Sequence, residues 1–505
     1  MTALERSRRL VLPEAIGRGH RAHPQRPALV FEGEALTHHE LHARSQRLAT
    51  VLAAAGVGRG DRVALLLHNG FEFVESLLAC HHLGAVAVPV NFRLAGDEIA
   101  YILSDSGSIA MISGLSAAGL PDMGLRLDVG SSYEQRRDSA EAHPEPAALG
   151  EDDAALMCYT SGTTGRPKGA VLTHGALVAS TLSWIHEMRA SEDDVWLSGQ
   201  PLFHIGGING LLPFLVLGAT SIVTPSGSFD AAASIDLIER HAVTMCIFVP
   251  TQWEALCRAD RVQAMDRARL RVAMWGASPA PRATLELMAA TFPGADIVSA
   301  YGQTEMSGAT TLLKGPDATR KMGSVGRPML GVELRVVDDE LRGVEPGGVG
   351  EVVYRGPTVM AGYHADGAGT AEAFAGDWFH SGDLATLDDE GYLWLVDRKK
   401  DLIVSGGENV YPAEVERVLR EHPAVADVAV VGVPHPRWVE TPLALVVPAA
   451  GASVDEEELI AHCRDRLAGY KKPSAIVAVD ELPRNAGGKV LKRRLRELHT
   501  DRFTA

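Results

Sequence analysis

The sequence predicts an α/β protein with more than one domain. Short runs of apolar and β-branched residues, such as 62–66 and 86–90, alternate with segments of helical pattern, such as 41–55 and 72–82. Such alternation is typical of largely parallel sheets covered by helices. A chain of 505 residues is also too long for one ordinary hydrophobic core.

Two domains are expected, 1–397 and 398–505, with the boundary in the charged run 397–401. Between 335 and 394, short strand-like runs separated by Gly- and Pro-containing turns predict a small β-rich subdomain of the first domain. The second domain is predicted to be a compact α+β module, with helices at 412–421 and 456–467 and strands at 427–433 and 443–448. The segment 113–149 has the weakest pattern and is expected to be loop-rich.

Composition narrows the class of protein. A net charge of −16 argues against a broad nucleic-acid interface, and 46% hydrophobic with 22% charged residues fits a globular enzyme. The five cysteines lack metal-binding spacing and are expected to be reduced core residues. Charges interrupt the first sixteen residues, and no apolar run is long enough to span a membrane, so a cytoplasmic monomer or homodimer is expected.

A segment rich in glycine and hydroxyl residues, 159–169 (YTSGTTGRPKG), follows a strand predicted at 154–158. Glycines let backbone N–H groups approach an anion closely, while hydroxyls and a lysine add donors and positive charge. The order differs from a Walker A loop, which requires GK followed by Ser or Thr. The segment predicts a phosphate-binding loop of another kind, with candidate ligands Thr160, Ser161, Gly162, Thr163, Thr164 and Lys168.

With this loop the chain resembles the adenylate-forming (AMP-binding) superfamily, which includes acyl-CoA synthetases, aryl-CoA ligases, peptide-synthetase adenylation domains and beetle luciferases. The likeness covers about 36–497 and is greatest to bacterial fatty-acyl-CoA synthetases. It implies a large N-terminal domain of parallel-rich sheets layered with helices, and a smaller, mobile α+β C-terminal lid domain. It also implies ATP, Mg²⁺ and coenzyme A as cofactors or co-substrates.

Motifs in the first domain agree with the resemblance, which implies their roles. In 301–305 (YGQTE), Tyr301 and Gly302 would bind adenine, Thr304 the α-phosphate, and Glu305 would hold Mg²⁺ together with Thr160. The motif 200–207 (QPLFHIGG) would place His204 beside the acid's carboxylate. The turn 275–278 would line the adenine with Gly276, Ala277 and Ser278.

Motifs near and beyond the boundary complete the resemblance. Asp383 and Arg398 match the ribose contacts, and Lys400 matches the hinge between the domains. The loop containing Gly406, Gly407 and Glu408 would serve thioester formation with coenzyme A. Lys489, in 483–489 (PRNAGGK), would bridge the carboxylate and the α-phosphate during adenylation. Gly487 stands where the family usually has Thr or Ser, and Val439 stands where Gly is common. The resemblance therefore does not define the detailed conformation of these two loops.

The resemblance implies an AMP-forming acyl-CoA synthetase. A carboxylic acid and ATP would give an acyl-adenylate and pyrophosphate, and coenzyme A would then take the acyl group and release AMP. A peptide-synthetase adenylation enzyme and a luciferase-type oxygenase share the nucleotide motifs and stay open as alternatives. A non-catalytic adenylate-binding protein would be expected to lose Lys168, Glu305 or Lys489, and all three are present.

The sequence defines the identity of the carboxylic acid substrate less closely than it defines the reaction. By resemblance, segments near 204–212, 248–253, 275–278 and 298–308 line its pocket, in which Gly206, Gly207, Gly210 and Gly308 are expected to leave room. No Arg or Lys in these segments would pair with a second carboxylate, so a monocarboxylic acid is expected. A medium- or long-chain fatty acid is the first expectation, and an aromatic acid of the 4-coumarate or benzoate type is the alternative.

Overall fold

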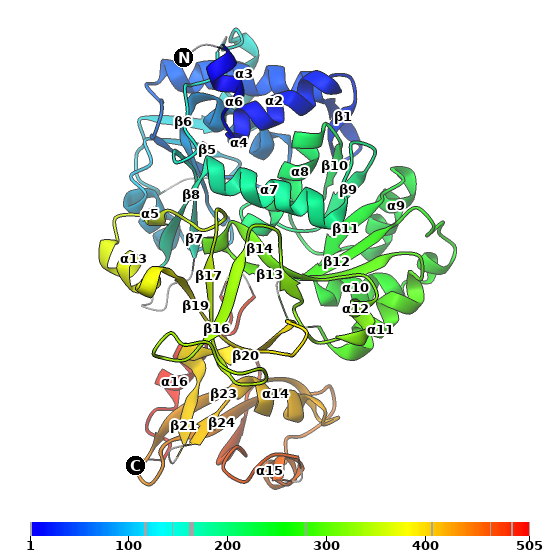
Figure 1. Ribbon diagram of the computed structural model, residues 1–505, viewed down its shortest axis with the longest axis vertical. Helices are drawn as coiled ribbons and strands as arrows, with labels where there is room; N and C mark the ends of the chain where they lie inside the picture. The colour runs from blue at the N-terminus through cyan, green and yellow to red at the C-terminus, as the bar shows by residue number, and fades with distance from the viewer. Residues whose placement is uncertain are drawn as a thin grey trace. The chain divides into compact units, whose positions relative to one another are not determined.

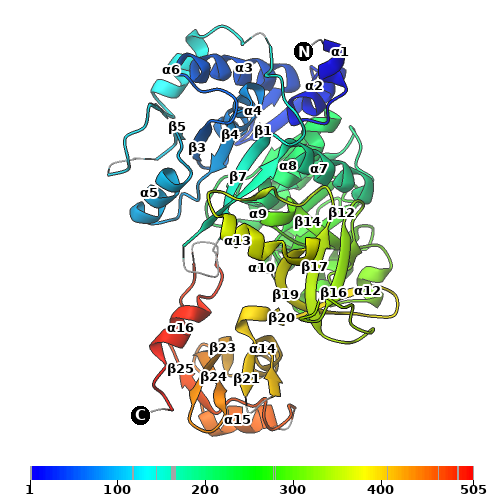
Figure 2. The same ribbon diagram turned by 60° about the vertical axis from the view of Figure 1, so that its left-hand side comes forward.

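The computed structural model describes residues 3–115, 119–143, 145–160, 166–276, 278, 280–405, 408–464, 466–485 and 488–503. The chain forms two compact units, the first of residues 1–334 and 354–379 and the second of 335–353 and 380–505 (Figures 1 and 2). The second unit therefore takes in 335–353 and 380–397 as well as the expected second domain. The boundary at 397–398 and the hinge at Lys400 stay predictions.

The first unit holds two mostly parallel sheets. In the described residues, one sheet has the strand order β15-β14-β13-β12-β11-β9-β10-β1-β2 and the other β18-β8-β7-β4-β3-β5-β6. The first sheet comprises β1 (Pro27–Phe31), β2 (Glu34–Thr37), β9 (Val195–Ser198), β10 (Thr220–Val223), β11 (Met245–Phe248), β12 (Val272–Gly276), β13 (Asp296–Gln303), β14 (Gly308–Leu313) and β15 (Arg327–Pro328). The second comprises β3 (Arg62–Leu66), β4 (Val86–Pro89), β5 (Ala110–Ser113), β6 (Leu125–Asp128), β7 (Ala154–Thr160), β8 (Lys168–Thr173) and β18 (Gly362–Tyr363).

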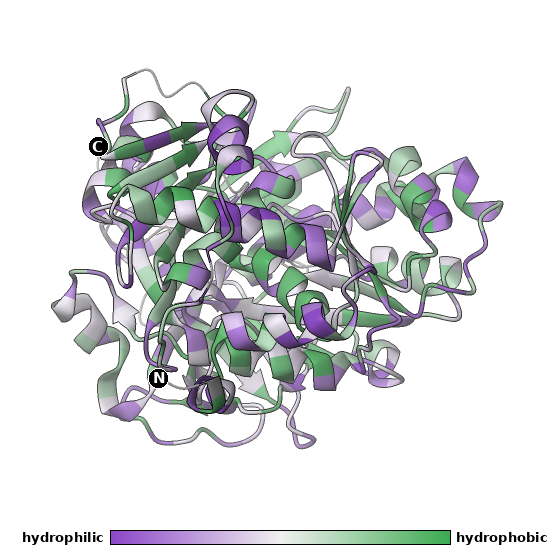
Figure 3. Cartoon of the chain, turned by 90° about the horizontal axis from the view of Figure 1, so that it is seen from above, coloured by the Kyte–Doolittle hydropathy of each residue, from purple (hydrophilic) through white to green (hydrophobic). Residues whose placement is uncertain are grey.

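Helices cover both sheets, as the alternating pattern predicted. The described helices of this unit are α1 (Ala3–Ser7), α2 (Leu12–Ala22), α3 (His38–Ala54), α4 (Phe71–Leu83), α5 (Gly96–Asp105), α6 (Ser132–Ser139), α7 (His174–Met188), α8 (Ile205–Leu217), α9 (Ala231–Arg240), α10 (Pro250–Arg258), α11 (Arg282–Thr291), α12 (Asp317–Arg320) and α13 (Gly367–Ala373). Hydrophobic residues dominate the strands, whereas the helices carry both kinds (Figure 3). No helix in the described part of the chain is long and apolar enough to cross a membrane.

Local sequence explains several element boundaries. The helix α3 starts at His38, earlier than the expected 41, because Thr37 and Glu40 form a capping box: the Glu40 N–H donates to Thr37 Oγ1 and the Thr37 N–H to Glu40 Oε2. The helix α8 ends at Leu217 and is capped by Gly218, whose φ of 73° suits glycine. The five cysteines are free and buried, as expected.

The segment 113–149 is more ordered than its composition predicted, since it contains β6 and α6. The helix α6 is polar, but Tyr133 and Arg137 both donate to the fully buried Glu75 carboxylate of α4, at 2.8 and 2.9 Å. Arg44 of α3 also pairs with this carboxylate at 2.6 Å. A buried charge needs such partners. The partner lies 58 or more residues away, so local pattern did not reveal the helix.

The second unit contains two sheets. The first has the order β16-β17-β19-β20, formed by Glu333–Val337, Gly350–Arg355, Phe379–Leu387 and Leu393–Arg398. The other contains β21 (Ile403–Ser405), β22 (Glu408–Val410), β23 (Val425–His435), β24 (Val439–Pro448) and β25 (Ala475–Ala478). The helices α14 (Pro412–Arg420), α15 (Glu456–Arg464) and α16 (Lys492–Leu498) belong to the same unit. These elements match the α+β module expected for the C-terminal region.

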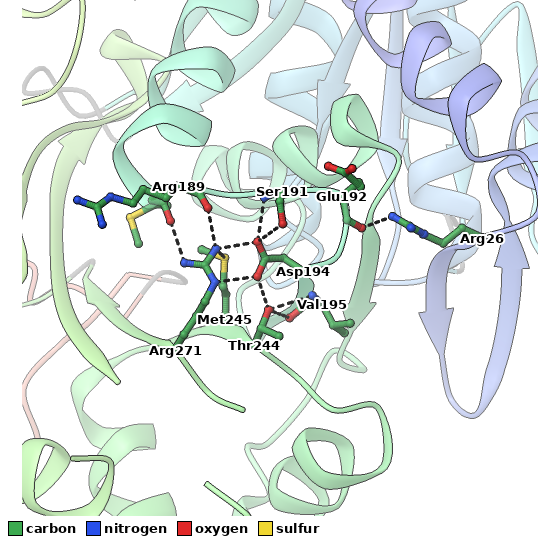
Figure 4. A network of polar contacts seen from close by, with 10 residues as sticks. Arg26, Arg189, Ser191, Glu192, Asp194, Val195, Thr244, Met245 and Arg271 are labelled. Carbon is green, nitrogen blue, oxygen red and sulfur yellow. Dashed lines mark hydrogen bonds and ion pairs between the residues drawn. The ribbon is translucent and has the colours of Figure 1, made fainter. Parts of the chain in front are cut away.

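A polar network fixes the amino ends of three strands of the nine-stranded sheet (Figure 4). Asp194, just before β9, accepts from Arg271 at 2.7 and 2.8 Å and from Thr244 at 2.7 Å. Arg271 precedes β12 and also donates to the carbonyls of Met188 and Arg189 at the end of α7. Burial alone would raise the pKa of Asp194, but the hydrogen bonds from Arg271 and Thr244 lower it.

We expect Asp194→Asn to lower the free energy of unfolding by about 2–4 kcal/mol, because it leaves a partly buried guanidinium without its charge partner. Asp193→Asn is the matched control. Its side chain is 84% exposed and pairs with Arg26, so the expected change is within about 0.5 kcal/mol. Denaturant unfolding followed by circular dichroism would measure both, and equal effects would contradict the structural role of Asp194.

Candidate active site

The two ends of the predicted phosphate loop lie side by side. Thr160 ends β7 and Lys168 begins β8, and the two residues are paired in the antiparallel register of these strands. Ser161, Gly162, Thr163 and Thr164 lie outside the described residues. The two described ends of the segment are therefore neighbours across an antiparallel pair of strands.

The neighbours of this hairpin were not predicted from the sequence. Tyr101 of α5 donates to the Pro167 carbonyl at 3.2 Å, and its hydroxyl also contacts Asp105 at 3.2 Å. Asp105 accepts from Tyr159 at 2.7 Å. Burial, followed by Asp105, raises the pKa of Tyr159, so this phenol stays a donor. The helix α5 therefore holds both ends of the loop in place.

Glu305 lies at the centre of the site. It is 9% exposed in a 3₁₀ turn, Thr304–Met306, directly after β13. Its Oε1 accepts from Thr160 Oγ1 at 3.2 Å and from Tyr363 Oη at 3.1 Å, and its carbonyl accepts from the Met360 N–H at 2.7 Å. The structure thus brings together the two residues proposed for the metal, Thr160 and Glu305.

A carboxylate and a hydroxyl are hard oxygen ligands of the kind that Mg²⁺ prefers. The described residues contain no cluster of three or more His, Cys, Asp or Glu side chains that could hold a metal. Two protein ligands fit an ion that also binds substrate phosphates and waters. The pair Thr160 and Glu305 therefore fits Mg²⁺ carried by ATP.

Lys168 is held beside this pair by residues that sequence reasoning missed. Its Nζ lies 2.8 Å from Asp366 and 5.1 Å from the centre of the Tyr363 ring. The hydrogen bond from Lys168 lowers the pKa of Asp366, and burial, followed by Glu305, raises the pKa of Tyr363. Asp366 also caps α13 by accepting from the Gly369 N–H at 2.8 Å. The carboxylate of Asp366 places the lysine charge at the loop.

The predicted adenine residues lie at the ends of neighbouring strands. Gly276 ends β12, where it is paired with Ala300 of β13, and Tyr301 follows in β13 as a half-buried residue. A Cβ on Gly276 would lie 2.6 Å from the Ala300 carbonyl, and one on Gly302 would lie 2.0 Å from the Gly308 carbonyl. Both glycines are thus needed for strand packing as well. Ser278 is exposed, and Ala277 lies outside the described residues.

His204 stands at the start of α8, where it is exposed and has an extended backbone. The His204 ring is the last of a row of neighbouring rings, two of which come from other loops. Its ring lies 4.5 Å from Phe203, Phe203 lies 5.3 Å from Phe92, and Phe92 lies 4.2 Å from His68, measured between ring centres. His68 and Phe92 follow β3 and β4, so these rings converge at the carboxyl ends of parallel strands, where α/β proteins bind ligands.

The glycines expected to open the acid pocket have a different role. A Cβ on Gly207 would lie 2.3 Å from the Pro201 carbonyl, one on Gly210 3.0 Å from Trp196 Cζ2, and one on Gly308 2.3 Å from Asn209 Nδ2. At Gly206 the nearest atom is the end of a longer side chain, Gln200 Oε1, at 2.5 Å. The space beside these glycines is filled by protein. They permit close packing of α8 against its neighbours.

The second unit brings together the predicted ribose contacts. Asp383 of β19 and Arg398 of β20 are paired in register, and Arg398 Nε lies 2.6 Å from Asp383 Oδ1. Asp383 is 4% exposed, and its N–H donates to Ser381 at 3.0 Å. Glu351 contacts the two residues that flank this pair, accepting from the Gly382 N–H and from Lys399, both at 3.1 Å.

Lys489 lies on a tight turn of the second unit and is exposed. Its N–H donates to Asn485 Oδ1 at 2.9 Å, and Asn485 N–H donates to its carbonyl at 2.8 Å. Arg484 braces the turn by donating to the Gly488 carbonyl at 2.6 Å and by pairing with Asp427 of β23. Lys400 and Glu408 are exposed, and Gly406, Gly407 and Gly487 lie outside the described residues.

We expect Glu305→Gln to weaken Mg-ATP binding and to lower the adenylation rate by about 10²-fold, because a neutral amide cannot balance metal charge. Tyr363→Phe is the matched control. It removes one hydrogen bond to Glu305 while it keeps the ring beneath Lys168, so a loss of less than about tenfold is expected. Calorimetry and pyrophosphate release would measure both. Equal losses would mean that Glu305 acts only as a structural anchor.

Comparisons with known proteins identify the family to which the chain belongs. The family model described as AMP-binding enzyme matches residues 18–364, and the model for the AMP-binding enzyme C-terminal domain matches 414–489. A feruloyl-CoA synthase from Amycolatopsis sp is 41% identical over 94% of this chain and 96% of its own length. A long-chain-fatty-acid–CoA ligase from Mycobacterium tuberculosis is 38% identical over 92% of this chain and 93% of its own.

A solved structure gives the same result for the fold. The O-succinylbenzoate coenzyme A synthetase from Bacillus subtilis, in complex with ATP and magnesium ion, superposes with a TM-score of 0.86, at 35% identity, over 95% of this chain and 98% of that chain. The family model alone covers more than half of the chain, and the likeness includes both units. The chain belongs to the AMP-binding enzyme family, that is, the adenylate-forming superfamily.

Proposed function

We propose that this AMP-forming acid–CoA ligase acts on an aromatic monocarboxylic acid. The observation that carries the proposal is the run of rings from His68 through Phe92 and Phe203 to His204, with centres 4.2–5.3 Å apart. Rings prefer edge-to-face and offset contacts with other rings, which gives an aryl acid an added gain over an alkyl chain. The 41% identity to a feruloyl-CoA synthase supports the same substrate class.

The enzyme uses ATP, Mg²⁺ and coenzyme A. In the first half-reaction a carboxylate oxygen of the acid bonds to the α-phosphorus of ATP, and the bond to pyrophosphate breaks. In the second, the coenzyme A thiol loses its proton and bonds to the acyl carbon, and AMP leaves. Such displacements depend mainly on positioning and charge neutralisation. Mg²⁺ supplies neutralisation of phosphate charge when it is bound.

We assign parts of the first half-reaction to residues of the first unit. Thr160 and Glu305 hold the metal, Lys168 neutralises phosphate charge, and Thr304 binds the α-phosphate. His204, at the start of α8, lies beside the acid's carboxylate. The ring of Tyr301 and the backbone at Gly276 bind the adenine. For the second unit, we propose that Asp383 and Arg398 bind the ribose.

A fatty acid, which was the first expectation from the sequence, is the second candidate. The 38% identity to a long-chain-fatty-acid–CoA ligase favours it. The described parts of the predicted pocket segments are largely apolar, which suits an alkyl chain as well as a ring. The fatty-acid preference stays a prediction beside the aromatic one.

A panel of acids distinguishes the two. Pyrophosphate release and thioester formation from Mg-ATP would be measured with benzoate, 4-coumarate, ferulate, octanoate, palmitate, malonate and several amino acids, with and without coenzyme A. We expect kcat/KM to be highest for a substituted cinnamate. A maximum at palmitate would overturn the aromatic proposal in favour of the fatty-acid ligase. Adenylation without any thioester would instead move the acyl acceptor to a carrier protein or oxygen.

Substitution of Lys489 tests whether this lysine acts in only one of the two half-reactions. We expect Lys489→Ala to lower the rate of adenylation by at least 10²-fold, since the lysine would stabilise charge at the α-phosphate. Thioester formation from a supplied acyl-adenylate should change less than about tenfold, if the lysine acts only in the first step. Arg493→Ala, an exposed α16 residue paired with Glu497, is the control. Equal losses in both half-reactions would contradict this assignment.

A further inference from the structure

The start of α14 is capped by a residue from another element. Tyr411, at the N-cap position, makes no side-chain cap hydrogen bond, and Pro412, at the first helical position, has no N–H to offer. The Ala413 N–H instead donates to Asp397 Oδ2 at 2.7 Å. Asp397 lies partly buried in β20, sixteen residues earlier in the chain. Both the hydrogen bond and the helix dipole favour a carboxylate at this position.

The residues just before Lys400 are held to the four-stranded sheet of the second unit. Arg398 pairs with Asp383 of β19 at 2.6 Å. Lys399 pairs with Glu351 of β17 at 3.1 Å. These contacts keep the end of β20 attached to its own sheet.

The residues after the predicted hinge are held to a different part of the second unit. Asp401 pairs with Arg496 of α16 at 2.7 Å, and Lys492 at the start of α16 pairs with Glu416 of α14 at 2.8 Å. The helix α16 follows closely after the turn that carries Lys489. The chain after the hinge, α14, α16 and the Lys489 turn are therefore joined to one another.

The hydrogen bond between Asp397 and Ala413 links these two parts, because Asp397 precedes Lys400 and Ala413 follows it. A large rotation about Lys400 would carry α14 away from the end of β20 and break the bond, since N–H···O hydrogen bonds extend only to about 3.2 Å. Such a rotation is expected from the assigned roles. Lys489 would serve the first half-reaction and 406–408 the second, and both follow Lys400, so one movement would present them in turn.

We propose that Asp397 is a latch for the hinge. Its carboxylate holds the chain after Lys400 in one of the two conformations that the half-reactions use, and its bond to Ala413 breaks on passage to the other. Asp397 is thus a positioning residue that acts through α14 and sets the balance between the conformations. The inference is independent of which acid is the substrate, and it rests on the hinge predicted at Lys400. A hydrogen bond to a charged group can change such an equilibrium by about tenfold or more.

The rates of the two half-reactions in single turnovers test the latch, because a general loss of active protein leaves their ratio unchanged. Adenylation of the best acid in the panel would be followed as pyrophosphate release, and thioester formation would be started by adding coenzyme A to preformed acyl-adenylate. In Asp397→Ala we expect the ratio of the two rates to change about tenfold. Asp397→Asn, which keeps a neutral acceptor, should give a smaller change in the same direction. A wild-type ratio in Asp397→Ala would overturn the latch.

Asp230→Ala is the matched control for the loss of a helix cap. Asp230 caps α9 of the first unit by accepting from the Ala233 N–H at 3.0 Å. Its removal should leave the ratio of the two rates within about twofold of wild type, because a lost cap away from the hinge affects stability alone. Circular dichroism would confirm that each variant is folded. An equal change of ratio in Asp230→Ala and Asp397→Ala would overturn the role of the hinge.

A covalent bridge tests whether the contact has to break. In the double variant Asp397→Cys, Ala413→Cys, a short reagent that joins two thiols would hold the two positions together. The five natural cysteines are buried, and the unsubstituted protein treated with the same reagent is the control. We expect the bridged protein to keep one half-reaction within about threefold and to lose at least 10²-fold in the other. Unchanged rates of both half-reactions on bridging would overturn the latch. A maximum at a fatty acid would change the acid used in these assays but not the expected ratios.

Discussion

The carboxylate of Glu305 ties the two sheets of the first unit together at the point where the nucleotide would bind. Thr160 reaches it from the end of β7 in one sheet, Glu305 itself follows β13 of the other, and Tyr363 reaches it from β18. A carboxylate that is 9% exposed is stable only with donors or a cation nearby. The contacts that this buried carboxylate requires therefore also join the two sheets, at the position that we propose for Mg²⁺. Structure and chemistry depend here on one charged group.

The amino ends and the carboxyl ends of the strands in the nine-stranded sheet have different roles. At the amino ends of β9, β11 and β12, the Asp194 network joins strands and α7 through fixed, fully paired polar groups. At the carboxyl ends lie glycines, a 3₁₀ turn and exposed side chains such as His204 and Ser278. This difference between the two ends of the strands is general in α/β proteins. The loops at the carboxyl ends can vary and bind ligands, while the amino ends stabilise the fold.

Glycines in the site show that a missing side chain does not by itself mean empty space. Gly207, Gly210 and Gly308 each face a backbone carbonyl or a neighbouring side chain. Gly210 brings α8 close to Trp196 of β9, and Gly308 of β14 lies close to Asn209 of α8. Trp196 is the largest of these and meets Gly210 directly. These contacts join elements that are distant in the sequence.

The sequence by itself determined the α/β class and the family, several of the strands and helices, and the position of the motifs that resemble nucleotide-binding ones. These features are carried by local patterns: alternation of apolar runs, capping residues such as Thr37 and Glu40, and ordered motifs such as 159–169 and 301–305. Only the tertiary structure decided which residues support them. Asp366 and Tyr363 at Lys168, Asp105 at Tyr159, Glu75 beneath α6 and Trp196 against Gly210 are all contacts across long stretches of chain. Such contacts depend on how sheets and helices pack, and a side chain's partner across a core leaves no periodic mark near either residue.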